Sequence, residues 1–166
     1  MGNAILNMKP TVEQPDTGID GRKRLAGNLS GILADTYLLL VKTQGYHWNV
    51  VGPLFVSIHR LTKEHYENLF AAGEMLAERI RALGYPVPTS VTEMITHTEI
   101  IEDTGNPSAH GMMDNLVQDH ETIARRLRSA AELADELRDR ATADLLTRRI
   151  EFHEEAIWML RAIVTS

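Results

Sequence analysis

The sequence predicts an all-α fold, a four-helix bundle in which a long crossover joins the second and third long helices. Three observations lead to this class. Apolar residues recur every three or four positions through four long stretches. Glycine and proline stand between the first three of these stretches. No segment shows the strict alternation that is typical of a half-buried strand.

The first two helices are expected to be long and joined by a tight connection. The first is predicted over residues 20–49, because its apolar side chains keep to one helix face. Gly52 and Pro53 end it and begin a tight connection. The second is predicted over residues 54–83, and Gly84 stands where glycine is favoured just past a helix end.

A connection of about twenty residues follows and is expected to carry a short helix, Ser90–Thr96. Ser90 and Glu93 have the spacing of a capping box. The third and fourth long helices are predicted over residues 108–137 and 141–164. Short first and last turns with one long middle crossover are a known four-helix arrangement.

Composition limits the functions that the chain can have. Residues 1–19 read as a flexible tail, and residues 20–166 as one domain. The absence of cysteine excludes disulfides and thiolate metal sites. No stretch is apolar enough to cross a membrane and the start has no secretory pattern, so a cytoplasmic protein is expected. The net charge of −6 does not favour general binding to DNA or anionic lipid.

One common metal motif is missing. Di-iron sites inside a single four-helix bundle use Glu-x-x-His pairs, whose spacing puts both ligands on one helix face. Here His65 follows Glu64 directly, and His153 comes two residues after Glu151. A di-iron centre within one subunit is therefore not expected.

A different set of ligands is present. His47 lies at the end of the first helix, His59 near the start of the second, and Glu74 and Glu78 four residues apart further along it. Imidazole and carboxylate suit ferrous iron, and also manganese or zinc. His59 and Glu78 are separated by about 28 Å at 1.5 Å per residue, too far to share an ion. An antiparallel second copy would bring them together, which indicates a site across a two-fold interface.

Three segments carry a resemblance to a known family. GYHWNVVGPLFVSIHRLTKEHYENLFAAGEMLAERIRALG (45–84) resembles the signature region of the Dps mini-ferritins. The stretches LVQDHETIARRLR (116–128) and HEEAIWMLRA (153–162) are similar to the third and fourth helices of that family. The resemblance covers the chain beyond the tail and implies a ferritin-like four-helix bundle.

The resemblance implies a twelve-subunit hollow shell with ferroxidase centres between two-fold-related subunits. His47 and His59 would come from one subunit and Glu74 and Glu78 from its partner, with Glu78 bridging. Trp48 resembles the tryptophan beside the centre.

The family resemblance also implies an activity. The centre would oxidise ferrous iron, typically with hydrogen peroxide, and the shell would store ferric mineral and protect against oxidative stress. Asp139 and Asp144 fall near the acidic positions of the three-fold pores that iron crosses.

The sequence departs from the family at Lys63, where an acid is usual four residues after His59. An ammonium cannot ligate a metal. At about 4 Å from a divalent ion it would cost on the order of several kcal/mol. We therefore expect one iron position to survive and the second to be weak.

Two alternatives to a full ferroxidase stay open. One is a non-enzymatic iron-sequestering cage, in which Lys63 has disabled the centre. The other is a nucleoid-associated DNA-binding protein, although the tail offers Lys9 alone for phosphate contacts. Singly, His47 and His59 could be structural histidines, and Glu74 and Glu78 a solvated face paired with Arg79 and Arg81.

Overall fold

The computed structural model describes residues 8–165 and contains five helices in that range. They are α1 (Arg22–Asn49), α2 (Phe55–Ala82), α3 (Val91–His97), α4 (Ala109–Glu136) and α5 (Arg140–Val164). The all-α class, the four long helices and the short crossover helix are confirmed, with boundaries within two residues of those expected. None of the helices is both long and apolar enough to cross a bilayer in the part of the chain described.

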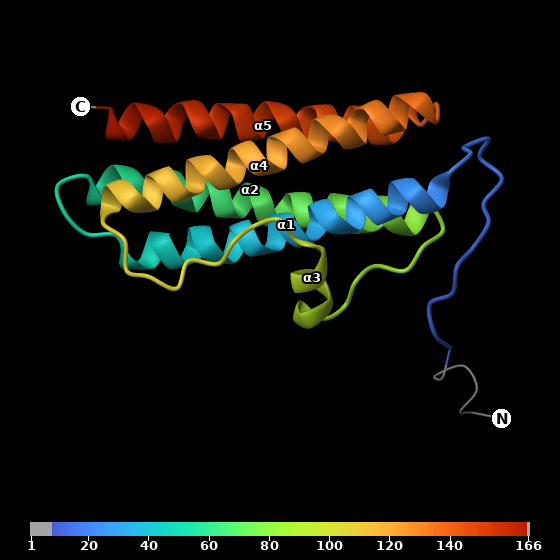
Figure 1. Ribbon diagram of the computed structural model, residues 1–166, viewed down its shortest axis with the longest axis horizontal. Helices are drawn as coiled ribbons and strands as arrows, with labels where there is room; N and C mark the ends of the chain where they lie inside the picture. Colours follow the sequence, from blue (N-terminus) through green and yellow to red (C-terminus); the bar gives the residue numbers. More distant parts are fainter. Residues whose placement is uncertain (1–7, 166) are drawn as a thin grey trace.

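The long helices form two neighbouring pairs. Figure 1 shows α1 beside α2 and α4 beside α5, while the crossover that carries α3 runs back along α1. Each long helix buries one apolar stripe between the pairs. Burial of one such side chain stabilises the fold by about 1.5–3 kcal/mol. The largest fully buried side chains include Leu25, Leu29, Ile32, Leu33, Leu39, Ile58, Leu69, Leu76, Ile80, Leu83, Met113 and Leu116.

The crossover is tied to the bundle by one buried carboxylate. Asp35 of α1 is fully buried and accepts hydrogen bonds at Oδ1 from the Thr98 hydroxyl (2.8 Å) and the Glu99 amide (2.7 Å). Its Oδ2 accepts one from Arg126 Nη1 of α4 (2.8 Å). A buried charge is tolerated only when it is paired and hydrogen-bonded in this way, so Asp35 fixes the path of residues 98–99.

The described part of the N-terminal segment makes a backbone contact with the bundle. The Glu13 amide donates to the Gly84 carbonyl across 2.8 Å. Gly84 has φ 95°, and a Cβ there would lie 2.3 Å from the Glu13 carbonyl oxygen. Glycine is thus required both by the backbone angle and by the approach of this segment. Positions 1–7 of the predicted tail lie outside the described residues.

The turn between α4 and α5 is fixed by Asp139, which lies at the N-cap of α5 and is buried. Its carboxylate accepts from the Thr142 amide (3.1 Å) and from Arg79 Nη2 of α2 (2.7 Å to each oxygen). The pKa of Asp139 is lowered, because burial, which acts to raise it, is outweighed by hydrogen bonds and charge from Arg79 and Thr142.

Replacement of Asp139 tests this anchor. Asp139→Ala removes a helix cap and leaves the partly buried Arg79 unpaired, so we expect the free energy of unfolding to fall by about 3 kcal/mol. Asp144→Ala serves as the matched control, because its pair with Arg148 is exposed and should be worth less than about 1 kcal/mol. Denaturant unfolding at one fixed protein concentration measures both. Equal losses of unfolding free energy in the two variants would contradict the role of Asp139 as the anchor of this turn.

Candidate metal centre

His47 and His59 face each other where α1 and α2 meet. His47 Nδ1 donates to the backbone carbonyl of His59 across 2.8 Å, and His59 Nδ1 donates to the carbonyl of His47 across 2.8 Å. The two rings stack with their centroids 3.8 Å apart and an interplanar angle of 15°. The connection between the helices is therefore closed by a reciprocal pair of side-chain hydrogen bonds.

This arrangement fixes which ring nitrogens are available. A carbonyl oxygen can only accept, so each Nδ1 must carry a proton, and in the neutral ring Nε2 then keeps its lone pair. Within residues 8–165 neither Nε2 has a hydrogen-bond partner. A metal-binding histidine usually has this form, with one nitrogen held by a carbonyl and the other free to ligate.

Neighbouring side chains hold the two rings in place. The Tyr66 ring meets His47 edge-on at 5.3 Å between centroids, and the Phe55 ring stacks on His59 at 5.0 Å. Thr62 is buried beside them and donates its hydroxyl proton to the Ile58 carbonyl across 2.7 Å. The histidines are consequently presented from a packed surface.

Glu74 and Glu78 are exposed on α2. In the described chain neither carboxylate is engaged in an ion pair, while Arg79 is bound to Asp139 and Arg81 lies 3.8 Å from Glu13. The alternative in which the two glutamates simply pair with neighbouring arginines is thus not supported. Their carboxylates are free to bind a cation.

The four ligands do not meet within one subunit. No group of three or more histidine, aspartate or glutamate side chains within residues 8–165 is placed to hold one ion. The surface around the candidate ligands is instead rich in exposed apolar side chains, as expected of an interface. These are Trp48, Val51, Leu54, Phe55, Val56, Phe70 and Met75.

The Lys63 side chain leads away from His59. Its ammonium forms an ion pair with Glu67, one further turn along α2, and lies 5.7 Å from the centre of the Tyr66 ring. Sequence reasoning missed Glu67, although the four-residue spacing of lysine and glutamate on one helix would have indicated the pair. Half of the Lys63 side chain stays exposed, so the charge remains close to the proposed interface.

The two candidate pore acids differ in their surroundings. The carboxylate of Asp139 is buried and fully engaged by Arg79 and Thr142, so it is not available to attract iron. Asp144 is exposed, with Arg148 Nη1 donating to it across 2.7 Å. Any pore role in this region therefore depends on Asp144.

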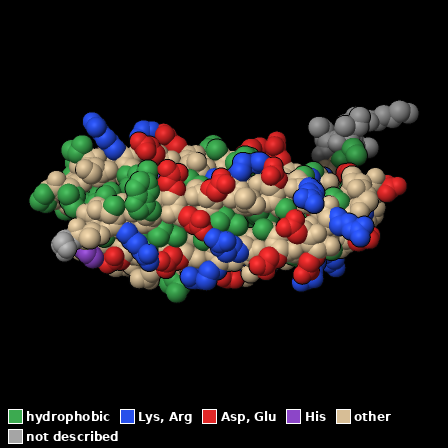
Figure 2. All heavy atoms as spheres, turned by 90° about the horizontal axis from the view of Figure 1, so that it is seen from above, with side chains coloured by type: hydrophobic (Ala, Val, Ile, Leu, Met, Phe, Trp, Pro, Cys, Tyr) green, Lys and Arg blue, Asp and Glu red, His purple; other side chains and the backbone are tan. Residues whose placement is uncertain are grey.

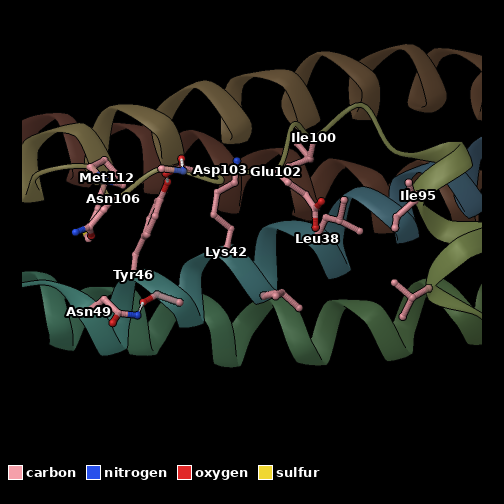
Figure 3. A pocket seen from close by; sticks show the side chains of 15 residues that line it. Leu38, Lys42, Tyr46, Asn49, Ile95, Ile100, Glu102, Asp103, Asn106 and Met112 are labelled. Carbon is pink, nitrogen blue, oxygen red and sulfur yellow. Dashed lines mark hydrogen bonds between the residues drawn. The ribbon is translucent and has the colours of Figure 1, made fainter.

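A separate groove of about 360 Å³ lies between α1, α3 and the crossover (Figure 3). Tyr46 and Lys42 point from α1 towards Asp103 of the crossover. The Tyr46 hydroxyl donates to Asp103 (2.6 Å), and Lys42 pairs with the buried Asp119 (2.6 Å). Burial and the Asp103 carboxylate raise the pKa of Tyr46 far above its ordinary range. The polar groups named here are already paired within the protein. His47 faces α2 and does not line this groove.

Comparison with known proteins agrees with this description. The Ferritin family model, described as a ferritin-like domain, matches residues 27–166. A low temperature-induced protein of Nostoc is 48% identical over 86% of this chain and 81% of its own length. A Dps protein from Bacillus brevis has 32% identity and a TM-score of 0.84 over 87% of this chain and 97% of that one. A Dps protein from Vibrio cholerae, described as a member of the ferritin-like diiron-carboxylate proteins, has 28% identity and a TM-score of 0.84, covering 92% and 100%.

The fold and the family match together define a ferritin-like protein. Within that class the chain belongs to the Dps family of mini-ferritins, as its sequence resemblance predicted.

The protonation of His47 and His59 can be observed directly. We expect magic-angle-spinning NMR of ¹⁵N-histidine-labelled apo-protein at pH 8 to show both rings protonated at Nδ1, because each Nδ1 donates to a carbonyl. The exposed His97, whose ring forms no hydrogen bond among the described residues, serves as the internal control. Protonation at Nε2 in either His47 or His59 would contradict the geometry.

Proposed function

We propose that this protein oxidises ferrous iron at centres shared by two subunits and stores the ferric product in a hollow shell. His47 and His59 of one subunit supply imidazole ligands, and Glu74 and Glu78 of a two-fold partner supply carboxylates. The observation that carries the proposal is the reciprocal hydrogen bonding of the two histidines, which leaves both Nε2 atoms free beside exposed apolar side chains.

The proposed assembly is the twelve-subunit shell of the family. The distance along α2 prevents one subunit from completing the site, so a second copy is needed. Apolar side chains around the ligands give that copy a surface to cover. An assembly whose subunits each carry −6 would attract cations through its negative field, and Asp144 is the acid that we place at the pores. We place this activity in the cytoplasm.

Ferrous iron is the substrate of the proposed reaction. Two ferrous ions give one electron each to hydrogen peroxide, whose O–O bond breaks to yield two hydroxide ions. Carboxylate ligands favour the more highly charged ferric product. Because the electrons go to peroxide in pairs, this route avoids hydroxyl radicals and would protect the cell.

Lys63 determines how tightly we expect the centre to bind iron. Its pair with Glu67 draws the ammonium along α2, which relieves the repulsion of an incoming ion without supplying a ligand. We therefore assign one firm iron position per subunit and a weak second one. The same residue favours the second candidate function, a cage that sequesters iron with little catalysis.

DNA binding is not part of the proposal. Figure 2 shows acidic and basic side chains interspersed along one face of the molecule, without a continuous basic stripe on that face. Non-specific affinity for DNA depends on neutralising several phosphates at once, and the net charge is −6.

Anaerobic titration of the apo-protein with ferrous iron, followed by a stoichiometric pulse of peroxide, tests the proposal. We expect about one tightly bound iron per subunit in the wild type and about two in Lys63→Asp, because the aspartate restores a ligand and removes a positive charge. Peroxide should oxidise iron in pairs, which in the wild type requires the weak second position to be filled, so we expect oxidation to be at least tenfold faster in the variant.

The matched control is Lys23→Asp, the same change at an exposed lysine of α1, which should behave as wild type. Two tight irons and fast oxidation in the wild type would show that Lys63 does not weaken the centre. Iron binding without oxidation by peroxide in the wild type, with oxidation restored in Lys63→Asp, would support the sequestering cage in which Lys63 has disabled the centre.

A further inference from the structure

Three histidines meet in the interior of the bundle, away from the proposed iron ligands. His65 comes from α2, His120 from α4 and His153 from α5. Their exposed fractions are 4%, 0% and 1%. The cluster thus links α2 to the α4–α5 pair, the two layers that Figure 1 shows one above the other.

The contacts within the cluster are close. One Nδ1 of His120 and His153 donates to the other across 2.8 Å. His65 packs edge-on against His120 with 5.6 Å between ring centroids, and Phe152 closes the group at 5.7 Å from His65. Arg149 lies over the Phe152 ring at 4.4 Å and donates to Asn68 Oδ1 across 2.6 Å.

Three polar atoms of the cluster have no partner among the described residues. They are His65 Nδ1, His120 Nε2 and Arg149 Nη2. A metal would be one explanation for grouped imidazoles, but no three ligands in residues 8–165 are placed on one ion. The Arg149 charge would also repel a cation. The three histidines of the cluster are better explained as neutral side chains whose protonation the fold disfavours.

The surroundings of all three histidines disfavour their protonated forms. Burial lowers the pKa of His65 to about 4. Burial also lowers the pKa of His120 and His153 well below their ordinary value, with a further contribution from Arg149 and from the other histidines of the cluster. Among the described residues, no carboxylate and no charged group of α1 contributes to these shifts. Full protonation would place three imidazolium ions beside Arg149 with no buried anion to balance them.

The sign of the pH dependence follows from these directions. A histidine is protonated in the unfolded chain near pH 6.5, whereas His65 in the fold resists protonation until about pH 4. The stability that the neutral cluster provides is therefore complete above about pH 6.5 and is lost as the pH falls towards 4.

We propose that His65, His120 and His153, together with Arg149, form an acid-sensitive latch that holds α2 against the α4–α5 pair at neutral pH and releases it on acidification. Release separates the α1–α2 layer from the α4–α5 layer and so destabilises the subunit. This regulation does not depend on iron binding, and its failure would leave the proposed ferroxidase unaffected.

Acid titration of the metal-free full-length protein tests the latch. Far-UV and near-UV circular dichroism between pH 7.5 and 3.5 would be compared for wild type, His65→Leu and the matched control His97→Leu, the same change at an exposed histidine. Each buried histidine that takes up a proton on opening changes the unfolding constant up to about tenfold per pH unit. We expect His65→Leu to open at a lower pH, with a slope reduced by about one proton, and His97→Leu to follow the wild type. An unchanged midpoint and slope in His65→Leu, or an equal shift in His97→Leu, would overturn the proposal.

A second measurement uses the wild type alone, in case His65→Leu does not fold. In ¹⁵N-histidine NMR the three buried rings should stay neutral through pH 6 and become protonated together with the loss of the near-UV signal. Protonation of these rings near pH 6.5 in a protein whose near-UV spectrum is intact would also overturn the latch.

Discussion

The reciprocal hydrogen bonds between His47 and His59 are the constraint on which the proposed centre depends. They close the α1–α2 connection and fix both imidazoles in the tautomer whose Nε2 is free. The two imidazole rings are therefore held in place before an ion binds, so binding requires little further ordering of these side chains. The length of α2 between His59 and Glu78 keeps the carboxylates away from the histidines, so the proposed centre needs a second subunit.

Buried charges elsewhere determine how the rest of the bundle is joined. Asp35 holds the crossover, and Asp139 holds the α4–α5 turn against α2. Each carboxylate has a guanidinium partner and further donors, which offset the cost of burial. The cluster of His65, His120 and His153 with Arg149 is different, because it has no anion. In the proposed latch this cluster is stable only while the histidines are neutral, which would make the interior of the subunit sensitive to acid.

The spacing of apolar residues was sufficient to predict the helices, because each long helix buries one apolar stripe, and glycine and proline marked the first two connections. The metal ligands were predicted from a family pattern, and their placement in the subunit agrees with a shared site without testing it. Contacts between residues distant in sequence could not be predicted. Asp139 was expected near a pore, yet its carboxylate is turned inward by Arg79, which is sixty positions away. Nothing in the spacing of His120 and His153 showed that they bond to each other and meet His65.

The central claim is that His47 and His59 of one subunit bind iron together with Glu74 and Glu78 of another. Anomalous diffraction at the iron edge, from crystals soaked anaerobically in ferrous iron, locates the metal without reliance on activity. The account predicts one strong peak per subunit at a two-fold interface, within bonding distance of a histidine Nε2 and a glutamate from different subunits. Iron bound wholly within one subunit, or at an interface that lacks His47 and His59, would contradict it.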